Sequence, residues 1–201
     1  METKKNWDMG NITAEEHMRH DWLFWKYALK TKPRIMMKYI EGKKGIDIGA
    51  GLGQFSDFLN SKGFDMTALE PNKELIKNAE CKKVIAKGEH IPFGDKFFDF
   101  SIVICALHHV EYVANTVKVL KEAKRVSNQI IIQELNRNNV FVRMFTKWTN
   151  LIYKEHTEDV NSFYTENSFK KLLEDAELEV IHYFKQSVFL VPNVYFWAIC
   201  K

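Results

Sequence analysis

The chain has 201 residues, of which 46% are hydrophobic, which suits one compact domain with a sizeable core and leaves little room for a second domain. Charged residues make up 27%, close to the average of globular proteins, which argues against extended disorder. A formal net charge of +3 gives no support for binding to nucleic acid, which normally needs a concentrated basic face.

The cysteines and the lengths of the apolar runs indicate further which classes of protein are poorly supported. Cys81, Cys105 and Cys200 have no metal-ligand spacing, and two of them lie within apolar runs, where thiols usually behave as small hydrophobic side chains. A disulfide framework and a metal site are therefore poorly supported. The first residues lack the apolar segment of a secretory signal, and no apolar run approaches the ~20 residues of a membrane-spanning helix. We expect a cytoplasmic protein.

The first 42 residues carry helix signals. Thr13 and Glu16 fit a capping box at the start of a helix. An apolar stripe follows at helical spacing: Met18, Trp22, Trp25 and Leu29. Pro33 fits the first turn of another helix that runs to about Gly42, where glycine suits a C-terminal cap. We expect a helical cap that packs on or near the functional site, although such a stripe is also typical of simple core.

From Lys44 onward, short apolar strands alternate with amphipathic helices. The expected strands are residues 44–48, 64–69, 83–86, 98–105 and 129–134. The expected helices are residues 53–62, 72–80 and 111–125. Alternating units of this kind build a parallel sheet with helices on both faces.

The C-terminal part departs from this alternation. After a helix at about 166–176, residues 178–190 and 194–200 have the pattern of two strands joined only by Val191-Pro192-Asn193. So short a connection cannot hold a crossover helix, and the pair must be antiparallel. We therefore expect an α/β fold with a seven-stranded, mostly parallel sheet that ends in an antiparallel hairpin. A plain dinucleotide-binding domain is not expected to end this way.

A glycine-rich segment lies at the expected junction of the first strand and its helix: Gly45-Ile-Asp-Ile-Gly-Ala-Gly-Leu-Gly53. Glycines there permit a tight turn and let a ligand approach the backbone. Ligands of open α/β sheets bind beyond the carboxyl ends of the strands, where this loop would lie. Glu70 ends the next strand, near the ~20-residue offset at which a carboxylate accepts ribose hydroxyls. The sequence therefore predicts a nucleoside-binding site.

Two residues distinguish this site from a dinucleotide site. Counted from Gly49, the sixth motif position holds Gln54, where a dinucleotide loop needs Gly or Ala. Asp47 precedes the first glycine of the loop and would repel a pyrophosphate, but it suits a ligand that carries an ammonium group. A cationic nucleoside is favoured over NAD.

Taken in order, these segments resemble the class I S-adenosylmethionine-dependent methyltransferases. Asp47–Gly53 resembles their motif I, and Leu69-Glu70-Pro71-Asn72 resembles motif II. Three further segments are similar to the small-molecule branch that includes the ubiquinone and menaquinone biosynthesis enzymes (methyltransferase type 11): Glu89–Phe93, Phe97–Val110 and Tyr164–Val180. The matched segments extend from about Lys44 to the C-terminus, and their order is more specific than motif I alone.

The resemblance implies a Rossmann-like fold, S-adenosyl-L-methionine as cofactor and S-adenosyl-L-homocysteine as product. It also implies direct in-line transfer of the methyl group to O, N or C of a small-molecule acceptor, in which positioning of the reactants lowers the barrier by ~7–11 kcal/mol. The residues that it places at the cofactor are Asp47, Gly49, Ala50, Gly51, Gly53, Glu70, Pro71, Gly88, Glu89, His90, Cys105 and Leu107.

Two positions depart from the family pattern. Lys87 occupies the position of an acid that usually reads the adenine amino group, so the adenine contact is expected to shift to the backbone near Gly88 and to Glu89. Residues 127–129 replace the usual Pro-Gly-Gly turn before the fifth strand.

The candidates for acid–base chemistry follow the fourth strand. His108 or His109 is the candidate general base or acceptor-orienting group, because an imidazole of pKa ~6.5 suits proton transfer near neutrality. Capping of the next helix, or contact with cofactor backbone, is the alternative for either histidine. Cys105 has no adjacent proline or basic partner in the sequence to lower its pKa, which favours a buried strand residue over a covalent nucleophile.

Residues 136–163 separate the fifth strand from the next helix by more than an ordinary connection of ~4–6 residues. Apolar side chains recur there at helical spacing: Phe141, Met144, Phe145, Trp148, Leu151 and Ile152. We expect a lid over a pocket for a hydrophobic or aromatic acceptor. Its basic residues would bind an acidic group or form a solvated helix face: Arg143, Lys147, Lys154 and His156.

The expected organisation is thus one methyltransferase domain over residues 1–201. It comprises a cap (1–42), a cofactor-binding core (43–135), the lid (136–163) and a C-terminal helix and hairpin (164–201). Three other interpretations stay open. They are a noncatalytic binder of adenosylmethionine or adenosylhomocysteine whose lid serves a partner, an NAD-dependent oxidoreductase, and an enzyme that methylates RNA or protein.

Overall fold

The computed structural model describes residues 30–152, 163–188 and 191–201. A helix over residues 30–36 comes first. The labelled elements are, in chain order, β1 (Lys44–Ile48), α3 (Gln54–Ser61), β2 (Asp65–Leu69), α4 (Lys73–Ile76), β3 (Lys82–Val84), β4 (Phe98–Ile104), the 3-10 helix η2 (Leu107–His109), α5 (Val113–Val126), β5 (Ser127–Leu135), α6 (Val140–Ile152), α7 (Glu166–Asp175), β6 (Val180–Val188) and β7 (Val191–Cys200).

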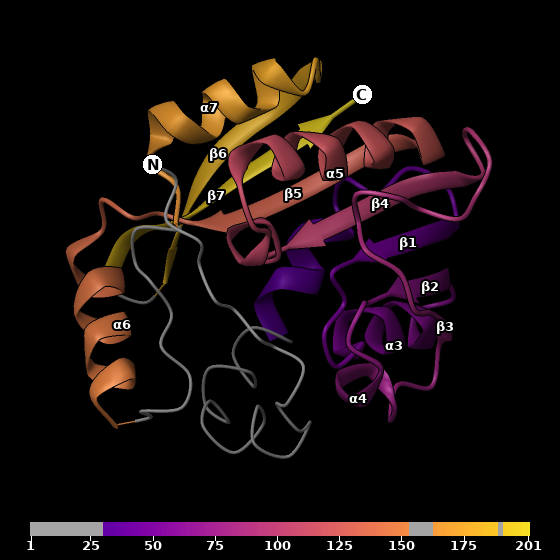
Figure 1. Cartoon of the computed structure of the whole chain (residues 1–201), viewed down its shortest axis with the longest axis horizontal. Helices are drawn as coiled ribbons and strands as arrows, with labels where there is room; N and C mark the ends of the chain where they lie inside the picture. The colour runs from indigo at the N-terminus through magenta and orange to yellow at the C-terminus, as the bar shows by residue number, and fades with distance from the viewer. Residues whose placement is uncertain (1–29, 153–162, 189–190) are drawn as a thin grey trace.

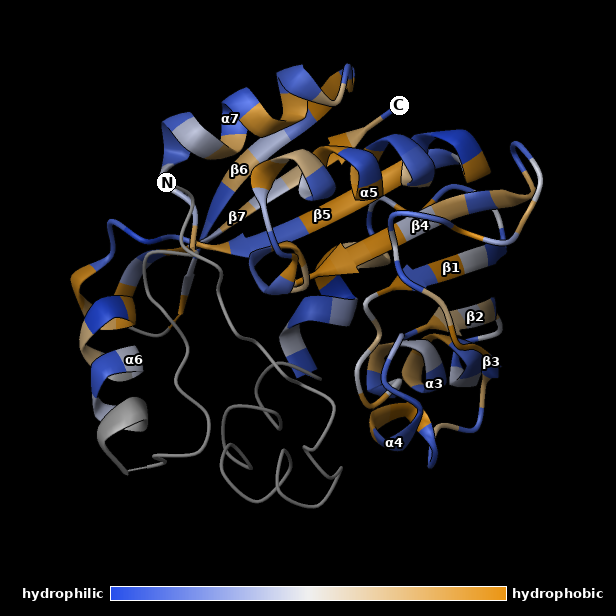
Figure 2. Ribbon diagram, viewed as in Figure 1, coloured by the Kyte–Doolittle hydropathy of each residue, from blue (hydrophilic) through white to orange (hydrophobic). Residues whose placement is uncertain are grey.

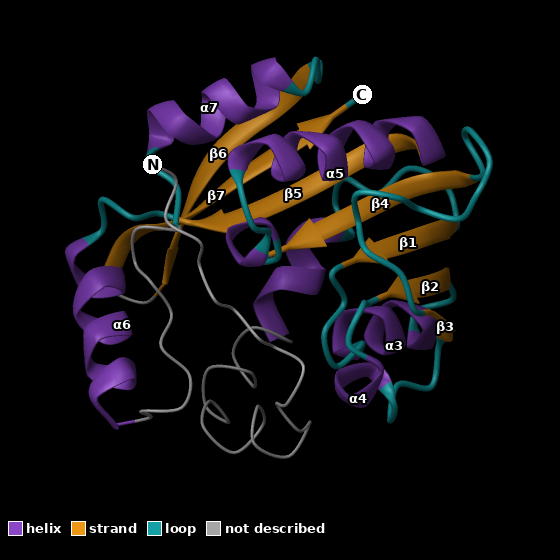
Figure 3. Cartoon of the chain, in the orientation of Figure 1, coloured by secondary structure: helices purple, strands orange, loops and turns teal. Residues whose placement is uncertain are grey.

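The seven strands form one sheet in the order β3-β2-β1-β4-β5-β7-β6 (Figure 1). The first five in the chain pair in parallel, whereas β7 pairs antiparallel with both β5 and β6. In Figure 3 the arrows of β4 and β5 point the same way, and β7 runs back toward the C-terminus. The predicted fold class is confirmed. The chain changes direction across the sheet between β1 and β4, and in open α/β sheets ligands bind at such a point.

Helices cover both faces of the sheet because the strands alternate apolar side chains between the faces. In β5, Ile130 and Ile132 pack with α5 and α7, whereas Ile131 packs with α3 and the helix over residues 30–36. Figure 2 shows β4 hydrophobic along most of its length, while α5 alternates between hydrophobic and hydrophilic residues, as expected of a helix with one buried side.

The first described helix ends earlier than predicted. It is already formed at Lys30 and gives way to turns after Met36, so Gly42 is not its cap. Gly42 has φ +90°, and a Cβ there would lie 2.4 Å from Cβ of Asp99. The Asp99 carboxylate accepts the N–H groups of Lys43 and Lys44 at 2.7 and 2.9 Å. Glycine is therefore needed for the close approach of this turn to β4, not to end a helix.

The helix predicted over residues 72–80 is also shorter, since α4 ends at Ile76. The Asp57 carboxylate accepts the N–H groups of Glu80 and Cys81 at 2.8–3.1 Å. These bonds hold the chain extended as it enters β3. A side chain on α3 thus competes with continuation of the helix.

The predicted Val191-Pro192-Asn193 turn is wrong, because these residues belong to β7. The pairing of β5 with β7 extends only to Leu135 and Tyr195, so Pro192 lies where β7 pairs on one side, with β6. A proline can be tolerated there because a strand with a neighbour on one side only makes ladder hydrogen bonds on that side alone. Asn193 has φ +53°, and the β6–β7 register shifts between Gln186 and Val188. The strand therefore bends at the position where the sequence suggested a turn.

The predicted helix around Thr13 to Leu29 lies outside the described residues, as do Lys154 and His156. The helix predicted within residues 136–163 is present as α6, which stands beside the end of β5 (Figure 1). Among the described residues, no helix combines the length and the apolar character needed to cross a bilayer.

Candidate functional site

A cavity of about 970 Å³ lies at the carboxyl ends of the parallel strands. Its wall includes twelve of the fourteen residues that the sequence predicted for the site: Asp47, Gly49, Ala50, Gly51, Glu70, Pro71, Gly88, Glu89, Cys105, Leu107, His108 and His109. The fold therefore brings together residues from the ends of three strands, β1, β2 and β4, and from the loop after β3.

The other two predicted residues, Gly53 and His90, are not part of the cavity wall. Gly53 precedes α3 with φ +74°, and a Cβ there would lie 2.5 Å from Cβ of Ala79. Its glycine is thus required by packing against the segment after α4. His90 is exposed at the surface. The sequence pattern alone could not separate these two positions from their neighbours, because both lie within the matched motifs.

The glycine loop, residues 49–53, is hydrogen-bonded to the end of β2. The N–H groups of Gly49 and Ala50 donate to the Leu69 carbonyl at 2.9 and 3.1 Å. Gly51 has φ +54°, and a Cβ built on it meets no atom within 4 Å. Since Gly51 lines the cavity, the missing side chain leaves its backbone open to a ligand.

Glu70 is the carboxylate at the end of β2. Its side chain is largely buried, and its two oxygens accept the N–H groups of Gly51 (2.9 Å) and Asn72 (3.0 Å). Burial raises the pKa of Glu70, and these two hydrogen bonds oppose the rise. Each carboxylate oxygen has a further lone pair that can accept a hydroxyl, so the group fits two neighbouring hydroxyls of a sugar.

Asp47 lies on β1, one residue before its end. It is 1% exposed and accepts a hydrogen bond from Ser56 Oγ at 2.9 Å. Burial raises its pKa to about 7, the Ser56 bond opposes this, and the nearby charge of Glu70 adds to it. Gln54 Oε1 is buried and has no hydrogen-bond partner among the described residues. Both side chains line the cavity, where a ligand with an ammonium group would neutralise the acid and donate to the amide.

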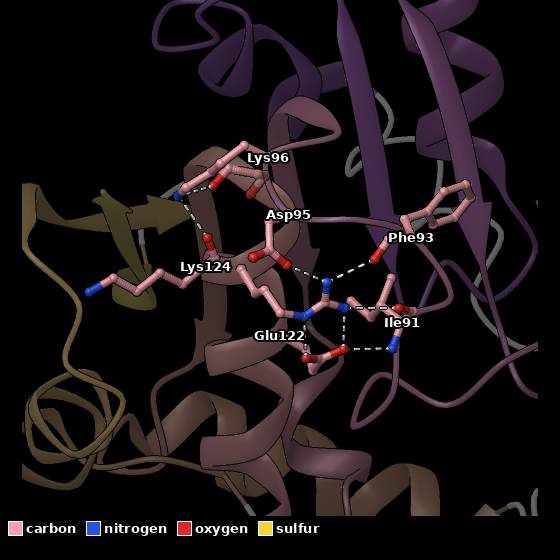
Figure 4. Close-up of polar contacts among 8 residues, drawn as sticks. Ile91, Phe93, Asp95, Lys96, Glu122 and Lys124 are labelled. Atoms are coloured by element: carbon pink, nitrogen blue, oxygen red, sulfur yellow. Dashed lines mark hydrogen bonds and ion pairs between the residues drawn. The ribbon is translucent and has the colours of Figure 1, made fainter.

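The loop after β3 carries Lys87, Gly88 and Glu89 into the cavity wall. Its next residues are held to α5 by Arg125, whose guanidinium donates to the carbonyls of Phe93 (2.8 Å) and Ile91 (3.0 Å). Glu122 accepts from Arg125 and also from the Ile91 N–H at 2.8 Å (Figure 4). The hydrogen bond to Arg125 lowers the pKa of Glu122 and keeps it charged. This clamp fixes one edge of the cavity.

Sequence reasoning missed Glu134, which lies on β5 and is 0% exposed. One oxygen accepts the Leu107 N–H at 2.7 Å, and the other lies 2.7 Å from Nδ1 of His108. The loop is packed further by Phe163, whose ring meets that of His108 edge-on at 4.9 Å. The sequence did contain a signal for this contact. Glu134 lies near the end of the predicted fifth strand, which pairs with the fourth strand, and His108 follows that fourth strand.

Cys105 has a basic neighbour that the local sequence does not show. Lys32, 73 residues earlier, places Nζ 3.3 Å from its Sγ. The thiol lies 3.4 Å from Gln133 Oε1, and the residue has φ +52°. The expectation that Cys105 has no basic partner is therefore wrong, because the partner comes from the helix over residues 30–36.

The cavity continues from the glycine loop toward α6 and β7. Apolar residues line this part: Phe55, Leu135, Phe141, Val142, Val188, Val191, Val194 and Tyr195. The lid residues Arg143 and Lys147 are exposed and absent from the wall. The cavity thus joins a polar half, with buried carboxylates, to an apolar half.

A seven-stranded sheet of this order, with a glycine loop after β1 and acids at the ends of β1 and β2, defines a Rossmann-like nucleoside-binding protein. Residues 15–183 match the family described as "Methyltransferase domain". The chain belongs to this family, and the predicted class of S-adenosylmethionine-dependent methyltransferase is confirmed.

Of three relatives, two are named as methyltransferases, one for a sterol and one for tRNA, and the third is uncharacterized. An uncharacterized protein from Methanocaldococcus jannaschii is 31% identical over 74% of this chain and 68% of its own length. A sterol 4-C-methyltransferase from Caenorhabditis elegans is 26% identical over 68% of this chain and 44% of its own length. A probable tRNA methyltransferase 9B from Homo sapiens is 29% identical over 48% of this chain and 22% of its own length.

Solved structures share the fold across nearly the whole chain. A possible histamine N-methyltransferase from Thermotoga maritima has a TM-score of 0.69 at 16% identity, and the match covers 93% of this chain and 97% of that one. Magnesium protoporphyrin IX methyltransferase from Synechocystis, solved with S-adenosylhomocysteine bound, has a TM-score of 0.67 at 11% identity, with 100% and 90% covered.

Proposed function

We propose that the chain transfers a methyl group from S-adenosyl-L-methionine to O, N or C of a small, largely apolar acceptor by direct in-line displacement. The observation that carries this proposal is that one cavity is lined both by the glycine loop with Glu70 and by apolar residues of β5, α6 and β7. Both reactants of a methyl transfer can occupy such a cavity together.

The residues of the polar half fit the methyl donor. Glu70 would accept the two ribose hydroxyls, Asp47 and Gln54 would meet the ammonium group, and Gly51 would let the ligand approach the backbone. The donor supplies a methyl group already activated on a positively charged sulfur. The wall formed by Gly88 and Glu89 would contact the adenine. The remaining predicted contacts at the wall are Gly49, Ala50, Pro71, Cys105 and Leu107.

His108 is our candidate for the general base. Because Nδ1 faces the Glu134 carboxylate, it holds the proton in the neutral ring, and Nε2 is then the basic ring nitrogen. His108 lines the cavity, where this imidazole would take a proton from an acceptor hydroxyl or ammonium. The His109 ring lies 4.1 Å from that of His108 and is the second candidate.

The shape of the cavity supports a small acceptor over RNA or protein. Its apolar half is lined by side chains from β5, α6 and β7, and the net charge of +3 provides no strong basic footprint. The terminal hairpin and Asp47 argue against a nicotinamide dinucleotide. The noncatalytic interpretation shares the cofactor site with the enzyme, so an assay of turnover must decide between them.

Two measurements test the proposal. S-adenosylhomocysteine should raise the unfolding temperature, and NADH should not, because a ligand that binds only the folded state stabilises it by mass action. Incubation with radiolabelled S-adenosylmethionine and a low-molecular-mass cell extract should then label a small molecule and release S-adenosylhomocysteine. Stabilisation by NADH alone would reject the proposed donor site, and donor binding without any product would leave the noncatalytic alternative as the conclusion.

A further inference from the structure

The outward face of α6 is apolar. Val142 and Thr146, four residues apart, are buried and line the cavity. Val140 and Met144 each precede one of them by two residues and therefore lie on the opposite side of the helix. Both are 61% exposed, and Phe141 beside them is 57% exposed. A surface helix of a globular domain normally turns polar residues outward, so the α6 patch (Val140, Phe141 and Met144) indicates an interaction surface.

The charged residues of α6 are all basic. Arg143 and Lys147 are exposed, and the helix contains no aspartate or glutamate. Arg143 follows Val140 by three residues and Lys147 follows Met144 by three, so each basic side chain neighbours the α6 patch. Apolar side chains with basic neighbours are typical of helices that lie in the interface of a membrane with anionic lipids.

The charges distinguish a bilayer from a second copy of the chain. In a twofold dimer through α6, the patch would face itself and bring Arg143 and Lys147 of one protomer close to those of the other. Like charges repel at such distances, and α6 has no acid to offset them. A bilayer with anionic headgroups offers negative charge for the basic side chains and an apolar layer directly beneath it for the patch.

We propose that α6 binds the surface of a bilayer that contains anionic lipids. The α6 patch enters the interface, and Arg143 and Lys147 contact the headgroups. The helix lies on the bilayer and does not cross it, because its 13 residues are fewer than the ~20 that a span requires. Because part of the attraction is electrostatic, the contact weakens as salt is added.

The α6 patch adjoins the cavity. Phe141 is 57% exposed and is also part of the cavity wall, next to the buried Val142. Leu135, Val191 and Val194 line the same apolar half. An apolar acceptor dissolved in the bilayer would therefore meet the cavity at Phe141, a consequence that rests on the proposed function. The contact between α6 and the bilayer does not depend on it.

The test is sedimentation of the full chain with vesicles at physiological ionic strength. The chain should bind vesicles of equal parts phosphatidylcholine and phosphatidylglycerol, bind poorly to phosphatidylcholine alone, and be released by high salt. The double variant Arg143→Gln with Lys147→Gln should weaken binding by about 25-fold, or about fivefold for each charge. Met144→Gln makes the centre of the patch polar and should weaken binding by at least about fivefold.

Matched control variants lie on α5, which covers a face of the sheet, whereas α6 stands beside the end of β5 (Figure 1). Val113 is 67% exposed, Lys118 and Lys121 are exposed, and none of the three lines the cavity. Val113→Gln, and Lys118→Gln with Lys121→Gln, remove the same kinds of group at another site. They should leave vesicle binding within about twofold, because charges away from the contact are screened.

No binding to the mixed vesicles, equal binding to both kinds of vesicle, or equal losses in the α5 and α6 variants would overturn the proposal. Without vesicle binding, dissociation of a dimer by Met144→Gln in analytical ultracentrifugation would show that a second copy covers the α6 patch instead. Vesicle binding needs neither methyl donor nor acceptor. Its failure therefore leaves the proposed methyl transfer intact, and failure of methyl transfer leaves the vesicle result intact.

Discussion

At the scale of single residues, a substitution of Gly51 can distinguish an effect on ligand binding from an effect on folding. The Gly51 backbone has φ +54°, and a Cβ there would meet no protein atom within 4 Å, so the main cost of valine to folding is backbone strain. We expect Gly51→Val to abolish detectable S-adenosylhomocysteine binding while the protein still folds, less stable by about 1–2 kcal/mol. Calorimetric titration and thermal unfolding measure the two effects.

Gly63 offers a matched control for this variant. It also has a left-handed backbone, with φ +87°, and a Cβ there meets no atom within 4 Å, but it lies outside the cavity wall. Gly63→Val should therefore cost similar stability and leave the affinity for S-adenosylhomocysteine unchanged. Unchanged affinity in Gly51→Val as well would refute the assignment of the glycine loop.

Glu134 supports a second prediction at this scale. Its carboxylate holds both the Leu107 N–H and Nδ1 of His108, and an amide in its place can still accept one of these bonds. If His108 is the base, Glu134→Gln should lower kcat by about 10- to 100-fold, because the imidazolium formed during proton transfer loses its anionic partner. The KM of S-adenosylmethionine should stay within about twofold. Equal losses in both constants would indicate a structural role only.

At the scale of elements, we expect the clamp between α5 and the loop after β3 to contribute both to the stability of the fold and to the affinity for the cofactor. Arg125 bonds two carbonyls of that loop and Glu122 of its own helix. Arg125→Met should lower stability by about 1–3 kcal/mol, because it leaves Glu122 and two carbonyls with fewer partners. The affinity for S-adenosylhomocysteine should fall several-fold as Gly88 and Glu89 lose their fixed position. Equilibrium unfolding and calorimetry test this.

Lys121 on the same helix provides the comparison. Its ion pair with Glu177 joins two exposed side chains, and such pairs contribute little to stability. Lys121→Met should therefore change the free energy of unfolding by no more than about 0.5 kcal/mol and the affinity for S-adenosylhomocysteine by no more than about twofold. A loss of affinity equal to that of Arg125→Met would mean that α5 acts through its general stability and not through the clamp.

At the scale of the whole molecule, the sequence predicted what depends on local pattern. The strands, their mostly parallel pairing and the terminal hairpin follow from the alternation of apolar segments, and Asp47 and Glu70 were placed because ligands of such sheets bind beyond the carboxyl ends of the strands. Lys32 with Cys105 and His108 with Glu134 were not predicted, because each pair joins residues 73 or 26 positions apart whose contact depends on packing. The bend at Asn193 depends likewise on which strand lies beside it.

The pH dependence of stability connects the site to the fold as a whole. The pKa of Asp47 is about 7 in the folded chain and 3.8 for an ordinary aspartate, so the folded state binds the proton more tightly. The resulting stabilisation is complete below pH ~4 and is lost as the pH rises through about 7. Glu70, whose pKa is also raised, acts in the same direction. Relative to Asp47→Asn, the ligand-free wild type should therefore lose a few kcal/mol of unfolding free energy between pH 5 and pH 8.

A ligand that places an ammonium group beside Asp47 reverses the balance at this carboxylate, because the positive charge favours the ionised form. S-adenosylhomocysteine should accordingly bind more tightly as the pH rises from 5.5 to 7.5, by up to about tenfold per unit, with release of a proton that calorimetry in buffers of different ionisation enthalpy can count. Asp47→Asn should bind weakly and with no such pH dependence. If wild-type affinity is flat across this range, or if the variant shows the same slope, Asp47 does not face the ammonium group, and the orientation proposed for the donor is wrong.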